Sequence, residues 1–104
     1  MLTTEQIEAL TPGVEIDNAV GEALGFSPGL LVPSYSLTPE AAVGLLEELE
    51  RRRWSFTIDY DKEDYEVVIF TPTLSWDCSA ETLPGALCKA FLLAHHYEAG
   101  KRRA

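Results

Sequence analysis

The 104-residue sequence predicts an α/β fold of the α+β type, a three-layer α-β-α sandwich with a small, mainly antiparallel sheet between helices. The first observation behind this prediction is a β-hairpin pattern at residues 54–71, where apolar and polar side chains alternate. The second is a set of segments with helical periodicity before and after the hairpin. A chain of this length is sufficient for one core, so we expect a single domain over residues 1–104.

Three helices are expected before the hairpin. The first is short and is broken by residues 11–13, which include a proline and a glycine. The second spans residues 14–24 and is ended by Gly25. The third begins at Thr38, whose hydroxyl caps a helix with proline at its first position, and runs to about Arg53. Its inward stripe is Ala42, Leu45, Leu46 and Leu49, whereas Glu47, Glu48 and Glu50 are expected on its solvent face.

The hairpin pattern predicts two strands of different burial. Along residues 54–60 every second side chain is apolar, which indicates a strand with one buried face. Residues 65–70 are apolar on both faces, so we expect an inner strand covered by helices on two sides. A short third strand is expected near residues 74–78, and a largely buried last helix over residues 83–99, ended by Gly100.

Charge is distributed unevenly along the chain. The net charge of −9 comes entirely from residues 1–50, which hold nine acidic and no basic residues. This half of the chain would repel phosphate, so we expect no direct binding of nucleic acid and favour a basic partner. The sequence has no signal-peptide pattern and no stretch of about 20 apolar residues, so no membrane association is expected. The candidate partner-binding residues are Glu15, Asp17, Glu22, Glu47, Glu48 and Glu50.

The sequence contains no recognisable catalytic or metal-ligating motif. A zinc site needs closely spaced pairs of ligands, which the cysteines and histidines do not form. The acidic residues of the hairpin turn do not match a calcium-binding loop, and there is no glycine-rich phosphate loop. We therefore expect no metal, no cofactor and no catalytic residues, and interpret the following as structural: Cys78, Cys88, His95, His96, Asp59, Asp61, Glu63 and Asp64.

A group of basic and aromatic residues is the candidate ligand-binding site. Arginine side chains could hold the phosphate of a small nucleotide signal while aromatic rings stack on its base. The alternative is that the arginines complement the dipole at the end of the third helix. The residues concerned are Arg51, Arg52, Arg53, Trp54, Tyr35 and Trp76.

Three segments resemble the phage ABA sandwich domain family, a group of small bacteriophage and prophage proteins. They are, in chain order, TTEQIEALTPGVEIDNAVGEALGF, PSYSLTPEAAVGLLEELERRRWSF and ETLPGALCKAFLLA. The resemblance implies a sheet with helices on both sides and a protein of the bacterial host's cytoplasm, but it supplies no catalytic residues. We expect a non-enzymatic protein that acts by binding, as an acidic inhibitor of a host defence protein. Capture of a small nucleotide signal across a homo-oligomer interface, an accessory structural role in the phage and an enzyme with an unrecognised site remain open.

Overall fold

The computed structural model describes residues 4–10, 13–25 and 33–103. These residues form an α+β fold in which an antiparallel sheet packs against helices, as the sequence predicts. The elements, in chain order, are α1 (Thr4–Ala9), α2 (Val14–Ala23), α3 (Pro39–Arg51), β1 (Ser55–Asp61), β2 (Asp64–Phe70), β3 (Ser75–Ala80) and α4 (Leu83–Arg103). Among the described residues, none of the helices combines the length and the hydrophobicity needed to cross a bilayer.

The sheet has the strand order β1-β2-β3, and both strand pairs are antiparallel. β1 and β2 are joined by the two residues Lys62 and Glu63, which have φ angles of 52° and 71°. Positive φ at both positions is the geometry of a type I′ turn, whose twist matches that of the flanking strands. This turn fixes a register in which Ile58 lies opposite Val67 and Phe56 opposite Ile69.

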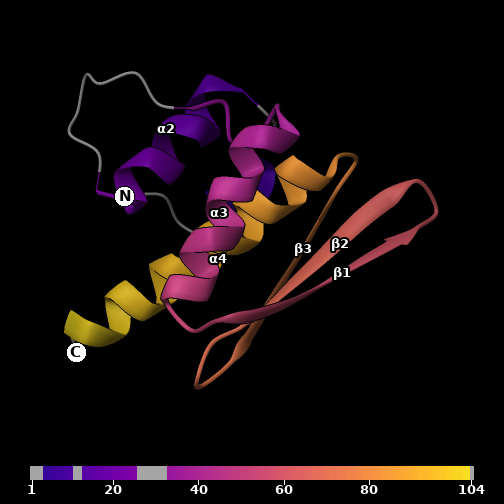
Figure 1. The fold of residues 1–104 in the computed structure, drawn as a ribbon. Helices are drawn as coiled ribbons and strands as arrows, with labels where there is room; N and C mark the ends of the chain where they lie inside the picture. Colours follow the sequence, from indigo (N-terminus) through magenta and orange to yellow (C-terminus); the bar gives the residue numbers. More distant parts are fainter. Residues whose placement is uncertain (1–3, 11–12, 26–32, 104) are drawn as a thin grey trace.

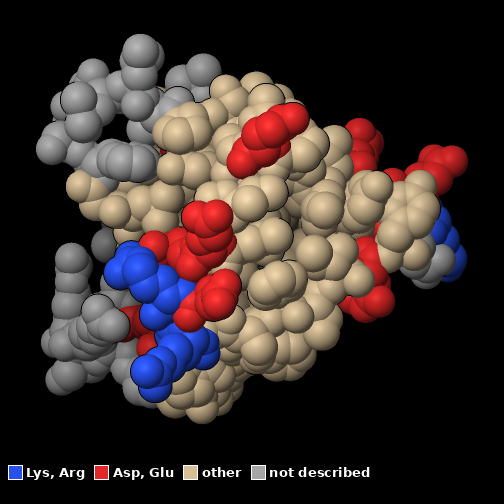
Figure 2. Space-filling view, in the orientation of Figure 1, with Lys and Arg blue, Asp and Glu red and all other residues tan. Residues whose placement is uncertain are grey.

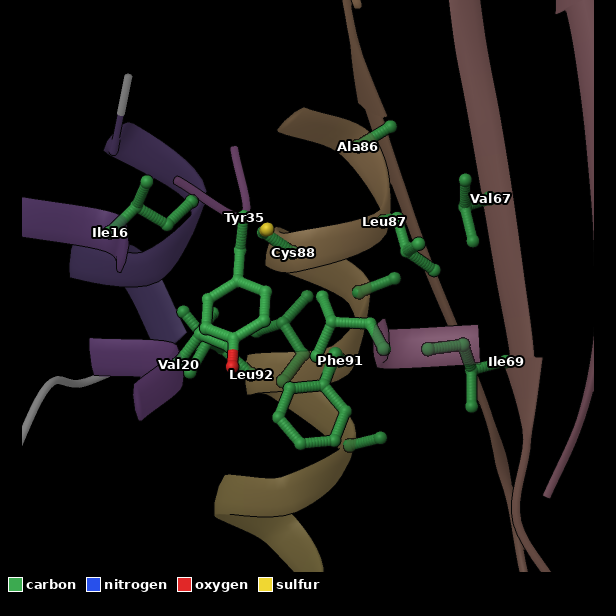
Figure 3. Packing of buried hydrophobic residues seen from close by; sticks show 14 of the residues in the cluster. Ile16, Val20, Tyr35, Val67, Ile69, Ala86, Leu87, Cys88, Phe91 and Leu92 are labelled. Atoms are coloured by element: carbon green, nitrogen blue, oxygen red, sulfur yellow. The ribbon is translucent and has the colours of Figure 1, made fainter. Parts of the chain in front are cut away.

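The last helix, α4, forms the centre of the molecule (Figure 1). One side of it packs against β2 and β3, and α1, α2 and α3 also pack against it. Figure 3 shows how its side chains divide, with Leu87 directed to the sheet and Leu92 lying beside Val20 of α2. Phe91, Leu87 and Cys88 are fully buried. The helix continues through Gly100, which was expected to end it, because an interior glycine costs a helix only about 1 kcal/mol.

The sheet was expected between two layers of helices, but Figure 1 shows all labelled helices on one side of it. Among the described residues, β2 is therefore covered on one face only. Val67 and Ile69 face the helices and are buried, whereas Phe70, on the opposite face, is 41% exposed. The physical reason is that α4 supplies apolar surface all round. α2 and α3 bury their apolar stripes against α4 rather than against the far face of the sheet.

The two ends of α3 are defined by different signals. At its start the Thr38 side chain accepts a hydrogen bond from the N–H of Ala41, which confirms the predicted N-cap. At its end the N–H of Trp54 donates to the carbonyl of Leu49 and the N–H of Arg53 to that of Glu50. This is a Schellman motif, in which the left-handed residue is usually glycine but is here Arg53, with φ 62°.

Candidate binding groove

The arrangement of α3, α4 and β1 leaves one side of the sheet only partly covered. β1 packs against β2, but α4 covers mainly β2 and β3, and α3 packs on α4 rather than on β1. The inward face of β1 therefore extends beyond the helix layer. Its apolar side chains remain accessible, with exposed fractions of 37% for Phe56, 38% for Ile58 and 62% for Tyr60. The expectation that this face of the strand is buried is therefore wrong.

The space between α3 and β1 is a groove of about 640 Å3. Most of its lining is apolar, and Ser36, Glu81 and Thr82 supply the polar part. Exposed apolar side chains line both sides of the groove. Val43 of α3 is 50% exposed and Leu37, just before α3, is 57% exposed. The floor and remaining walls are formed by Leu46, Ile58, Tyr65, Leu83 and Leu87.

Acidic side chains surround this apolar surface. On α3 the exposed residues Glu40 and Glu47 lie three and four positions from Val43, so they occupy the same helix face. Glu81 lines the groove at the end nearest the start of α4. Figure 2 shows the resulting pattern, a broad uncharged area with acidic side chains at its margins and a basic cluster to one side. Such a surface favours a ligand with an apolar centre and basic flanks.

Two of the three arginines proposed as ligand contacts, Arg51 and Arg52, are already engaged with other groups, whereas Arg53 is exposed. The carboxylate of Glu48 accepts hydrogen bonds from Arg51 and from Nε of Arg52, the latter at 2.6 Å. The Arg52 guanidinium also lies about 5 Å from the ring centroids of Trp54 and Phe91. Its Nη1 is 3.0 Å from Nδ1 of His95 and donates to it, because arginine has no acceptor. Arg52 therefore holds the end of α3 against α4, whereas Arg51 bonds Glu48 within α3.

The ionisation of Glu48 follows from these contacts. Burial disfavours the charged carboxylate, but hydrogen bonds from Arg51 and Arg52 and their positive charges outweigh burial. The pKa of Glu48 is consequently lowered from its ordinary value of 4.5. Glu48 is ionised at neutral pH and neutralises much of the charge of the two arginines beside it.

The aromatic residues of the candidate ligand site are not brought together. Tyr35 is 5% exposed and lies among core residues between α2 and α4 (Figure 3). Burial, followed by the nearby Cys88, Asp17 and Glu48, raises the pKa of Tyr35 above 10.0. The Trp76 ring is tilted by 44° against that of Tyr97 at a centroid distance of 4.9 Å, whereas Trp54 packs on Phe91. The six basic and aromatic residues therefore do not form one shared site.

Two of the six proposed partner-binding acids are buried, which corrects the interpretation of both as surface charges. Asp17 is 5% exposed and accepts hydrogen bonds from the N–H and hydroxyl of Ser36, at 2.8 and 2.7 Å. Glu48 is 9% exposed and bonds the arginines. Asp17 was expected on the surface because its partner, Ser36, lies on a distant segment. Glu48 was expected there because its pairing with Arg51 and Arg52 depends on how the end of α3 packs. The other four are exposed: Glu15, Glu22, Glu47 and Glu50.

Cys88 and His95 have structural surroundings. Cys88 is fully buried beside Tyr35, and burial, with the charge of Asp17, raises its pKa to about 12. A thiol with that pKa is not a nucleophile at neutral pH. His95 stacks on Phe91 and bonds Arg52. Among the described residues, no three side chains of His, Cys, Asp or Glu are grouped closely enough to hold a metal ion.

Sequence reasoning did not find the groove. Its signal was present in Val43, an apolar residue outside the inward stripe of α3, and in the exposed Leu37 beside that helix. Isolated apolar surface residues are common, so neither position is informative by itself. They become informative once the fold places them opposite Ile58 across an open groove.

The comparisons with known proteins include a solved structure of similar fold. No protein-family model matches the sequence, and a search of curated proteins finds no match. The fold is similar to that of a phage protein from Bacillus cereus ATCC 14579, with a TM-score of 0.65 and 28% sequence identity. The similarity covers 81% of this chain and 91% of that protein. It therefore extends over almost the whole of the B. cereus protein.

Proposed function

We propose that this chain is a phage or prophage protein of the ABA sandwich family that acts in the host cytoplasm by binding a host protein. The proposal is supported by the similarity to the B. cereus phage protein and by the family resemblance of the three sequence segments. Binding a defence protein and inhibiting it is the form of this function that we favour. The protein needs no metal, cofactor or catalytic residue for such a role.

The observation that carries the proposal is the apolar groove between α3 and β1. Exposed apolar surface costs stability and solubility, and a contiguous patch with a charged margin is typical of a surface that another molecule covers. Val43, Ile58 and Leu37 supply the apolar part, and Glu40, Glu47 and Glu81 the acidic margin. The complementary partner has apolar anchor residues flanked by Lys or Arg.

Capture of a small nucleotide is less compatible with these contacts. A phosphate would have to compete with the Glu48 carboxylate for Arg51 and Arg52. Tyr35, which was expected to stack on a base, is a core residue. The groove is lined by apolar side chains and bears acids at its margin, so it would repel phosphate.

The proposal is tested by affinity purification from infected host cells, using the wild-type protein and two variants. Val43→Glu places a negative charge in the groove, whereas Leu74→Glu makes the same change at a residue of similar exposure, 45%, in the β2–β3 loop. Captured proteins are identified by mass spectrometry and their binding is measured again with purified components. We expect a defined host protein that Val43→Glu loses and Leu74→Glu retains. Equal retention by both variants would contradict the proposal.

A further inference from the structure

The hydrogen-bonding groups at the outer edge of β1 can be assigned from the register of this strand with β2. The turn bond makes Asp61 and Asp64 a hydrogen-bonded pair, and such pairs alternate along an antiparallel ladder. The pairs between the hydrogen-bonded ones contain Phe56, Ile58 and Tyr60. The N–H and C=O groups of these three residues therefore point away from β2. Within the described part of the chain, no other strand pairs with this edge.

The same three residues direct their side chains to the helix side of the sheet. Phe56, Ile58 and Tyr60 lie on the face that carries Ile69, Val67 and Tyr65, and Ile58 lines the groove. A strand placed beside β1 would bond their free backbone groups, and every second side chain of that strand would enter the space next to α3. Backbone pairing and filling of the groove are thus compatible in one binding mode.

The face of β1 that points away from the helices indicates which charge the added strand should carry. Asp59 lies directly opposite Glu66, and both side chains are exposed. Like charges opposite each other destabilise a strand pair. A Lys or Arg on the outer side of Asp59 would offset this repulsion, and Glu40 and Glu47 at the groove margin favour the same sign of charge.

We propose that an extended segment of the partner protein adds to β1 as a fourth strand, with apolar residues at alternate positions entering the groove and a basic residue beside Asp59. This inference rests on the proposed function and specifies the partner's recognition segment. A second copy of this chain fits less well. It would bring another net charge of −9, and between the apolar residues of its own β1 it carries Thr57 and Asp59 rather than a basic residue.

The test uses amide hydrogen exchange, followed by NMR, on the full-length protein with synthetic peptides. The probe is a capped peptide of alternating valine and lysine, and the control has the same composition with its valines in one block. The alternating peptide is expected to slow exchange at the N–H groups of Phe56, Ile58 and Tyr60 by at least about tenfold at saturation. The N–H groups of Thr57 and Asp59 already pair with β2 and should change little.

Two variants locate the effect on β1. Ile58→Glu places a charge on the groove side of the strand and should abolish binding, whereas Thr57→Glu places the same charge on the open face, beside the lysines of the peptide, and should retain it. Both residues are exposed, and circular dichroism establishes that each variant is folded.

The outcomes separate the two proposals. Unchanged exchange at Phe56, Ile58 and Tyr60, or equal binding of the block peptide, would overturn strand addition. Protection that appears without peptide and increases with protein concentration would assign the edge to a second copy and also overturn it. If a host protein binds in a Val43-dependent way but these amides stay unprotected, strand addition fails and the proposed function stands.

Discussion

Replacing Glu48 by glutamine tests the contacts that fix the end of α3 beside the groove. The Glu48 side chain is 10% exposed, and its carboxylate accepts hydrogen bonds from both Arg51 and Arg52. Glutamine keeps one acceptor oxygen but turns an N–H2 group toward guanidinium donors. The substitution therefore leaves part of the buried guanidinium of Arg52 without its partner.

The expected decrease in the free energy of unfolding follows from the exposure of each arginine side chain. A hydrogen bond to a charged group contributes about 1.5–3 kcal/mol when shielded from water. The Arg52 side chain is 22% exposed and provides most of this, whereas Arg51 is 73% exposed and adds at most about 0.5–1 kcal/mol. We expect Glu48→Gln to lower the free energy of unfolding by about 2–3 kcal/mol. For a domain of this size the melting temperature should fall by about 10–20 °C.

Urea unfolding at pH 7, monitored by tryptophan fluorescence, measures this loss. The matched control is Glu47→Gln, which makes the same change at the adjacent, exposed residue and should alter stability by less than about 0.5 kcal/mol. A loss below about 1 kcal/mol, or equal losses for the two variants, would refute the reasoning.

The pH dependence provides a second check of the same contacts. Because the pKa of Glu48 is lower in the folded than in the unfolded state, its contribution is complete above about 4.5 and is lost as pH falls through the lowered folded value. The stability difference between wild type and Glu48→Gln should therefore shrink progressively below pH 4.5. A difference that stays constant into the acid range would contradict the assignment.

Three further stability predictions follow from backbone conformation and burial. Arg53→Gly should stabilise the protein by about 0.5–1 kcal/mol in urea unfolding, because φ 62° is unfavourable for a residue with a side chain; destabilisation would contradict this. The double change Lys62→Asn and Glu63→Gly places the preferred pair in the type I′ turn and should add about 1–2 kcal/mol, measured in the same way. Ser36→Ala removes a hydroxyl that bonds Asp17 and accepts from the N–H of Gly13, and should cost about 1–3 kcal/mol in thermal unfolding. A loss smaller than about 0.5 kcal/mol would show that water replaces this hydroxyl.

The features that the sequence predicted well depend on neighbouring residues. The Thr38 cap followed by proline, the alternation that predicts strand β1 and the glycine after α2 each act within a few positions. The burial of the apolar face of β1 was predicted wrongly, because it depends on where the distant helices pack. Gly25 has φ 93°, the left-handed conformation that a glycine after a helix indicates. The third strand and the largely buried last helix also follow from local apolar pattern.

The features that were missed depend on residues far apart in the chain. Asp17 was placed on the surface because its partner, Ser36, is 19 positions away. The end of α3 has no glycine, so the turn at Arg53 had no sequence signal. The groove requires knowing that α4 covers β2 and β3 but leaves β1 extended, which depends on how the helices share the apolar surface of α4.

Site-specific photo-crosslinking at Val43 in host cells tests whether the groove binds a host protein. A benzophenone amino acid replaces Val43 in the groove in one protein and Leu74, in the β2–β3 loop, in another. We expect a defined adduct with one host protein from position 43 and none from position 74. No adduct at position 43, or the same adducts from both positions, would contradict this function of the groove.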